Sequence, residues 1–195
     1  MQPWPASEYF RAYTPHTVTE PNPSARRAEL LVAAYDYVLA NGVADLSLRP
    51  LAASTGTSPR VLLYLFGSKD GLVREILAHA RTEQRCVVRA RLAGGDPVDA
   101  LWSWLSAPGQ RPTVRLFLEA YARSLHPDPG PWRGFAQDSV SEWLELLGES
   151  GVSPTLHLAV LRGLLLDLLA TGEVDRVDAA YREFRAVILR ATPER

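Results

Sequence analysis

The side chains that carry out covalent or metal chemistry in enzymes are sparse and poorly spaced in this chain. Its four histidines show no metal-ligand spacing, and the chain contains neither a glycine-rich phosphate loop nor a nucleophile-elbow pattern. Ser124, His126 and Asp128 have the residue types of a catalytic triad, but such close neighbours on one loop rarely converge in space. A single cysteine, Cys86, excludes a disulfide framework and a thiolate metal cluster. We therefore expect no enzyme activity, no catalytic residue, no cofactor and no metal.

A different chemistry is available in the segment TGTSPRVLLYLFGSKDGL, residues 55–72. Arg60 offers the forked donor that pairs with guanine, and Val61 offers an apolar surface for a thymine methyl group. Tyr64 and Lys69 offer a hydroxyl and an ammonium group, which suit phosphate oxygens. Lys69 is the only lysine among 21 basic residues. These side chains would form a DNA-contacting set if the segment presents them together.

The segment is expected to be helical rather than extended. Ser58 followed by Pro59 is a helix start, because the serine hydroxyl caps free N–H groups and proline loses nothing at the first helical position. Leu62 and Phe66, four residues apart, then face the core. Arg60, Val61 and Tyr64 fall on the other side. A strand here would have no partner, since no other segment alternates with a period of two.

Capping and stop signals predict helices along the rest of the chain, about nine in all, and no strands. The sequence therefore predicts an all-α fold, with a three-helix domain over residues 24–70 and a helical bundle over 71–195. Residues 1–23 are proline-rich and are expected to form an extended arm, either without function or packed on its own domain or on DNA. The expected helices cover 24–41, 47–56, 58–66, 69–92, 97–105, 112–125, 132–147, 154–171 and 174–190.

Three short helices, with the tight turn TGT between the second and third, are typical of a helix-turn-helix domain. In such a domain the helix that follows the turn, here 58–66, enters the DNA major groove. The stretch LSLRPLAASTGTSPRVLLYLFGSKDGLVREIL, residues 46–77, resembles the DNA-binding motif of the tetracycline-repressor (TetR) family of bacterial transcriptional regulators. The residues that carry the resemblance are Ser47, Leu51, Ala52, Gly56, Ser58, Tyr64, Phe66, Ser68 and Lys69.

The resemblance implies a sequence-specific regulator, commonly a repressor, that binds a near-palindromic site in double-stranded DNA. Two leucines depart from the family pattern: Leu63 replaces the first of two adjacent aromatics, and Leu65 replaces a frequent His or Tyr. One phosphate contact is therefore expected to be missing, because leucine cannot hydrogen-bond. This leaves open an alternative, a helical protein-interaction module with a weakened or lost DNA-binding surface. The expected DNA-contacting residues are Arg26, Ser47, Arg49, Ser58, Pro59, Arg60, Val61, Tyr64 and Lys69.

The resemblance also implies that the rear helices enclose a pocket for a small, apolar or aromatic effector and form a homodimer. The aromatic residues expected to line the pocket are Trp102, Phe117, Tyr121, Trp132 and Trp143, with plain core packing as the alternative for each. The helix 154–171 is apolar on more than one face, which fits its own bundle plus a partner subunit. A central helix in a monomeric bundle is the alternative. The residues expected at the interface are Val160, Gly163, Leu164, Tyr181, Phe184 and Ile188.

Charge and composition place these functions in a cytoplasmic protein. Residues 1–92 hold 11 Lys and Arg against 8 Asp and Glu, while residues 93–195 hold 10 against 14, so a DNA contact is expected in the front part. No basic region followed by an apolar core begins the chain, and we expect no signal peptide. The most apolar segment carries His157, Arg162 and Asp167, so we expect no membrane span.

Overall fold

A computed structural model describes residues 23–44, 46–92, 96–148 and 153–191, so the expected arm lies outside the described residues except for Pro23. All regular structure in these ranges is helical, which confirms the predicted all-α fold. The helices are α1 (Pro23–Asn41), α2 (Leu48–Ser54), α3 (Pro59–Phe66), α4 (Lys69–Leu92), α5 (Pro97–Leu105), η1 (Pro108–Gln110), α6 (Arg111–Ser124), η2 (Gly130–Trp132), α7 (Phe135–Leu147), α8 (Pro154–Thr171) and α9 (Val174–Ala191).

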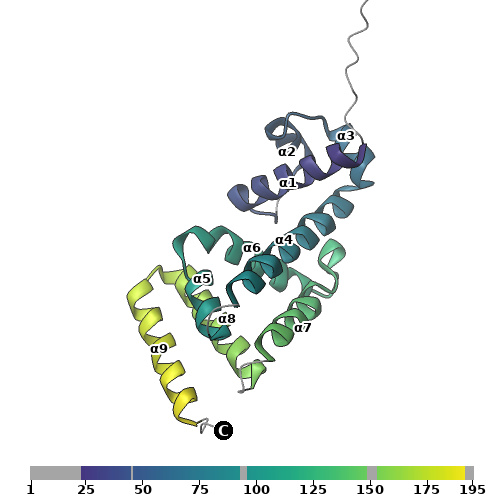
Figure 1. Cartoon of the computed structure of the whole chain (residues 1–195). Helices are drawn as coiled ribbons and strands as arrows, with labels where there is room; N and C mark the ends of the chain where they lie inside the picture. The colour runs from purple at the N-terminus through teal and green to yellow at the C-terminus, as the bar shows by residue number, and fades with distance from the viewer. Residues whose placement is uncertain (1–22, 45, 93–95, 149–152, 192–195) are drawn as a thin grey trace, which may run out of the picture.

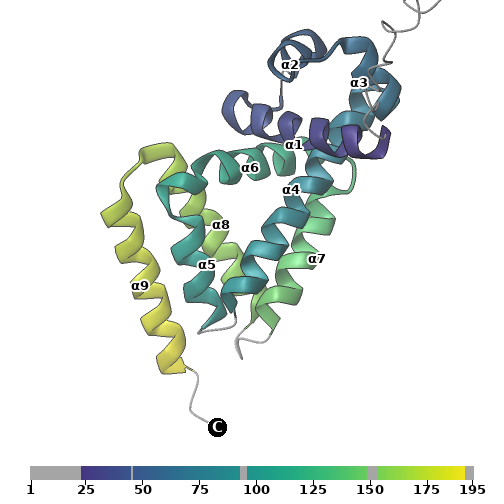
Figure 2. The same ribbon diagram turned by 45° about the horizontal axis from the view of Figure 1, so that its top comes forward.

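Helix α1, of 19 residues, and the two short helices α2 and α3 form a group at one end of the molecule (Figure 1). The long helix α4 leads from this group into a bundle that also contains α5, α6, α7 and α8 (Figure 2). Helix α9 lies along the outside of the bundle, next to α8. Helix α6 packs against α1 as well as against α7 and α8. The bundle therefore contacts the front group through two helices, α4 and α6.

Side-chain caps explain the starts of α3, α4 and α5. The hydroxyl oxygen of Ser58 accepts a hydrogen bond from the N–H of Val61 at 3.3 Å, and that of Ser68 accepts one from Gly71 at 2.9 Å. Asp96 caps α5 in the same way. These caps satisfy N–H groups that have no partner within the helix. Ser24, in contrast, lies inside α1 rather than capping it, because that helix already begins at Pro23.

The buried apolar residues fall into two clusters. The first cluster comprises the inner faces of α1, α2, α3 and the first part of α4, together with Leu116 and Ala120 of α6, Trp132 of η2 and Phe135 of α7. The second cluster comprises the inner faces of α5, α8 and α9 with parts of α4, α6 and α7. The first cluster is thus completed by residues of the rear bundle, which ties the front helices to it.

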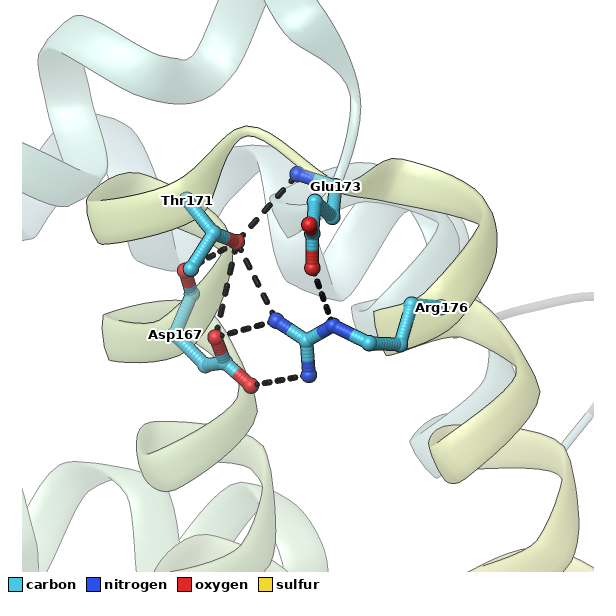
Figure 3. A network of polar contacts seen from close by, with 4 residues as sticks. All are labelled: Asp167, Thr171, Glu173 and Arg176. Atoms are coloured by element: carbon cyan, nitrogen blue, oxygen red, sulfur yellow. Dashed lines mark hydrogen bonds and ion pairs between the residues drawn. The ribbon is translucent and has the colours of Figure 1, made fainter.

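The corner between α8 and α9 is held by a surface network of polar side chains (Figure 3). Both terminal nitrogens of Arg176 contact the carboxylate of Asp167, at 2.8 and 2.6 Å, and its Nε pairs with Glu173. Hydrogen bonds to Asp167 raise the pKa of Arg176 further above its usual range. The hydroxyl of Thr171 accepts a bond from the N–H of Glu173 at 3.2 Å. The network fixes the turn that brings α9 back along α8.

Polar contacts inside the molecule fix the position of α9 on α5. Arg185 is 7% exposed and contacts the carboxylates of Asp96 at 2.5 Å and Asp99 at 2.8 Å. Burial alone raises the pKa of Asp99, but hydrogen bonds from Arg185 and Tyr181 outweigh it and lower the pKa overall. The ring of Tyr181 also stacks on Trp102, with centroids 4.7 Å apart. These contacts anchor the last helix to the bundle.

Candidate DNA-binding surface and ligand cavity

Helices α2 and α3 have the geometry of a helix-turn-helix. The turn passes through Gly56, whose φ of 63° lies in the left-handed region that favours glycine. Leu62 and Phe66 are buried in the first cluster, as predicted, so α3 is held by one face. Tyr64 on the other face is 81% exposed. The side chains on this open face are Arg60, Val61, Leu63 and Tyr64.

The remaining residues expected at DNA surround this face. Lys69 is exposed at the first position of α4, where free N–H groups add to its positive charge. A Cβ at position 71 would lie 2.2 Å from the carbonyl oxygen of Phe66, so the close approach of α4 to α3 requires Gly71. Arg26 pairs with Glu29 at 3.0 Å and is half-buried. Of the others, Ser47, Arg49 and Ser58 are exposed and Pro59 is half-buried.

Arg27 of α1 connects three of the front helices. Its Nε donates to the carbonyl oxygen of Leu65 near the end of α3 at 3.2 Å, and its terminal nitrogen pairs with Glu75 of α4. Its guanidinium also lies 5.3 Å from the ring centroid of Phe66. Sequence reasoning did not select Arg27, because nothing local distinguishes it from Arg26. It fixes the exposed face of α3 relative to α1 and α4.

A cavity of about 70 Å³ lies inside the rear bundle. Its walls come from α4, α5, α6, α7 and α8, and most of its lining side chains are apolar. Since one water needs about 10–15 Å³ measured in this way, the cavity has room for a small molecule of a few water volumes. A concave, mainly apolar cavity with few polar groups is the usual form of a small-molecule site.

The cavity also contains polar side chains that sequence reasoning missed. Ser139 is 4% exposed, and its hydroxyl oxygen has no hydrogen-bond partner. Gln84 is 8% exposed. Arg162 donates to the hydroxyl of Tyr121 at 3.2 Å, and its guanidinium lies 4.5 Å from the centroid of the Tyr121 ring. Ser139 and Gln84 interrupt otherwise apolar helix faces, and such an interruption is a signal that the sequence does contain.

Three of the five aromatics predicted to line the pocket do so, namely Phe117, Tyr121 and Trp143. Trp102 does not line this cavity, because its ring stacks on Tyr181 and its Nε1 donates to Asp178 at 2.9 Å. Trp132 also lies elsewhere: it is buried in the first cluster. Neither of these two tryptophans therefore lines this cavity. Both are held in the core by contacts that are distant in sequence.

The residues predicted at a dimer interface divide into two groups. On α8, Gly163 is exposed, and Val160 and Leu164 are half-buried. On α9, Tyr181 and Ile188 are buried within the single chain, and half-buried Phe184 meets the ring of His157 edge-on, with centroids 5.6 Å apart. The apolar stripe of α9 therefore packs on its own bundle. Tyr181 and Ile188 are thus covered within the single chain, and their contact with a partner stays a prediction.

Helix α8 has a second apolar face that remains open. By length and composition it could cross a membrane, with a mean hydropathy of 1.3 over Pro154–Thr171 and 28% of that window buried. One face, which includes Leu161 and Leu165, packs in the second cluster. The open face carries apolar residues at alternating spacings of three and four, as in a helix-packing seam. We call these residues the α8 stripe: Leu156, Ala159, Gly163, Leu166 and Ala170, all exposed.

In the described residues, an all-helical fold with an exposed recognition helix and a cavity in the rear bundle has the features of a helix-turn-helix DNA-binding protein with a helical C-terminal domain. The sequence pattern of the family described as bacterial regulatory proteins, tetR family, matches residues 30–76. Together with the relatives below, this match over the DNA-binding motif supports a resemblance to the TetR family of bacterial transcriptional regulators. Proteins of this family are, in general, cytoplasmic transcription factors rather than enzymes.

A curated relative is the HTH-type transcriptional regulator BetI of Stenotrophomonas maltophilia, which is 29% identical over 108 residues. That match covers 52% of this chain and 55% of the relative, so it spans about half the length of each. Among solved structures, the multidrug binding protein EbrR complexed with imidazole is 27% identical, with a TM-score of 0.63 over 89% of this chain and 93% of that chain. A TetR-family member from Streptomyces coelicolor A3 is also 27% identical, with a TM-score of 0.63 over 87% and 99%.

Proposed function

We propose that this protein is a ligand-responsive, sequence-specific DNA-binding transcriptional regulator of the cytoplasm, acting as a homodimer. The observation that carries the proposal is the combination of an open α3 face with a ligand-sized cavity in the attached bundle. Repression that is released by the effector is the commoner behaviour of the family, and we propose it here.

In the proposed complex, α3 enters the major groove. Arg60, at the second position of the helix, reads a guanine, and Val61 contacts a thymine methyl group. Tyr64 and Lys69 contact phosphates on either side and fix the orientation of the helix. Leu63 is 41% exposed on the same open face, so it can reach DNA but offers no hydrogen bond. The alternative, an interaction module without DNA binding, is not favoured, because the family match covers this motif.

The proposed dimer forms through the α8 stripe. Its exposed side chains are small or leucine, and a Cβ at Gly163 would meet nothing within 4 Å in the single chain. A second α8 can therefore approach closely along this face, in the way that small residues allow helices to pack. Twofold symmetry would place two copies of α3 about one DNA turn, roughly 34 Å, apart, which requires a near-palindromic site.

The route from the cavity to the DNA-binding helices runs through α6 and α4. Phe117 lines the cavity, and its ring centroid lies 5.4 Å from that of Phe135, a buried member of the first cluster. Ile76 and Leu77 of α4 belong to the same cluster. A ligand that displaces Phe117 therefore moves residues that hold the front helices. It changes DNA affinity only if it fits the DNA-ready and DNA-unready forms unequally.

The test is an electrophoretic mobility-shift assay on the DNA upstream of the protein's own gene. We expect a shifted band that persists with excess random DNA. Arg60→Ala should weaken binding to this site by about 1–3 kcal/mol and relax one base position, while Lys69→Ala should weaken binding to all sequences. Arg190→Ala at the far end of α9 is the matched control and should have no effect. Equal loss on specific and random DNA for Arg60→Ala would contradict its role as a base reader.

A further inference from the structure

The cavity in the rear bundle has a positive side chain and no negative one. Arg162 is its only charged lining residue, and no carboxylate contributes to the walls. In the part of the chain that the structure describes, Arg162 takes part in no ion pair. Two glutamates of the wall-forming helices α6 and α7 pair with other arginines: Glu119 with Arg123, and Glu142 with Arg81 and Arg85. Arg162 is half-buried, and within the described residues its guanidinium contacts the ring and hydroxyl of Tyr121 but no carboxylate.

The cavity also has hydrogen-bonding capacity that the chain itself does not use. The buried hydroxyl of Ser139 has no partner, although buried polar groups are almost always hydrogen-bonded. Arg162 uses one donor for the Tyr121 hydroxyl, and a guanidinium has five. Buried Gln84 lines the same space. A ligand without polar atoms would leave the Ser139 hydroxyl unsatisfied and the Arg162 charge unpaired.

We infer that the effector of this cavity is a small apolar or aromatic molecule that carries a carboxylate or another anionic oxygen group. The anionic oxygens accept hydrogen bonds from Arg162 and from the hydroxyl of Ser139, while the apolar part contacts Phe117 and Trp143. This inference rests on the proposed function, because it names the ligand class of the same cavity. It departs from the chain's overall charge, since residues 93–195 are net acidic. The guanidinium of Arg162 determines which ligand charge the cavity favours, because charges act most strongly at close range in a low-dielectric site.

The size of the cavity narrows the class to molecules of about one ring. At about 70 Å³ it holds on the order of five water-sized spheres before any wall moves. Benzoate, benzamide and benzylamine form a matched series of this size, with an anionic, a neutral and a cationic group on the same ring. Their dissociation constants can be measured on the full-length protein by isothermal titration calorimetry at concentrations up to several millimolar.

We expect benzoate to bind at least about tenfold more tightly than benzamide and benzylamine to bind most weakly. Arg162 can donate to the carbonyl oxygen of benzamide as well, but only with benzoate are both the donor and the acceptor charged, and the ammonium group of benzylamine repels the guanidinium. Arg162→Gln should remove the difference between benzoate and benzamide, while Arg162→Lys should retain part of it. Ser139→Ala should weaken benzoate several-fold. Arg123→Gln is the matched control: this arginine also lies over an aromatic ring, that of Trp132, but outside the cavity, and the change should leave all three constants unaltered.

Salt gives a second measurement that does not depend on any variant. Added salt should weaken benzoate binding and leave benzamide binding nearly unchanged. Benzamide or benzylamine binding as tightly as benzoate, or no detectable binding of benzoate, would overturn the inference. An Arg162-dependent preference for benzoate with no effect on DNA binding would instead leave the inference standing and refute ligand control of the proposed regulator.

Discussion

The substitution Arg185→Met should destabilise the protein by about 2 kcal/mol. Methionine keeps most of the length and apolar contact of the arginine side chain but removes the charge that meets Asp96 and Asp99. A hydrogen bond to a charged group contributes about 1.5–3 kcal/mol, and Arg185 makes two such contacts. The loss is less than their sum, because the side chains of the two aspartates are 36% and 56% exposed and become hydrated when the arginine is absent.

The assay is equilibrium unfolding in urea, followed by circular dichroism and by tryptophan fluorescence, since Trp102 lies in the same contact region. Arg182→Met on the same helix is the matched control. Arg182 pairs with Asp178 at 3.1 Å but is 70% exposed, so its removal should change the stability by less than about 0.5 kcal/mol. Equal effects of the two substitutions would refute the conclusion that buried polar contacts fix α9 on α5.

Three further predictions concern acid stability, assembly and coupling. Burial and the nearby charge of Arg185 lower the pKa of His157 from 6.5, against the opposing effect of Asp96. As the pH falls below 6.5, the unfolded chain therefore binds a proton before the folded one does, and the folded state loses stability. His157→Leu should reduce this loss, measured by urea titrations at about pH 7 and pH 5. Gly163→Arg should give a folded monomer by light scattering that no longer binds the operator, whereas a dimer that still binds it would exclude the α8 stripe as the interface. Phe117→Ala should leave DNA affinity intact but reduce the effector's 5- to 150-fold change in it, measured by fluorescence anisotropy, and an undiminished response would exclude this route.

The starts of α3 and α4 could be predicted from sequence because their causes are local, whereas the helix expected from residue 132 begins only at Phe135, after the separate turn η2. The starts at Ser58-Pro59 and Ser68 follow from a side chain and a backbone within four residues of each other, and the structure contains these caps. The inner and outer faces of α3 were also predicted correctly, since the spacing of Leu62 and Phe66 leaves one arrangement that buries both. These inferences need no knowledge of distant parts of the chain.

The partners of buried side chains could not be predicted in the same way. Trp102 of α5 stacks on Tyr181 of α9, and no sequence feature near either residue indicates this contact between helices that are far apart in the sequence. The stripe of α9 has the same period whether its own chain or a second subunit covers it, so periodicity alone does not show that Tyr181 is covered by its own bundle. Arg162, in contrast, was noted only as an obstacle to membrane insertion, because its place in the cavity depends on how α8 is rotated.

The orientation of α8 about its own axis directs its side chains to three different surroundings. Leu161 and Leu165 face the second cluster and the cavity, Arg162 reaches the Tyr121 ring at the cavity wall, and Gly163 belongs to the open stripe. A ligand anion that draws Arg162 toward the cavity therefore acts on the helix that the proposed dimer uses. Because the spacing of the two recognition helices depends on how two copies of α8 meet, a small rotation there changes the fit to both half-sites. Ligand control in this chain can thus operate between subunits as well as through the first cluster.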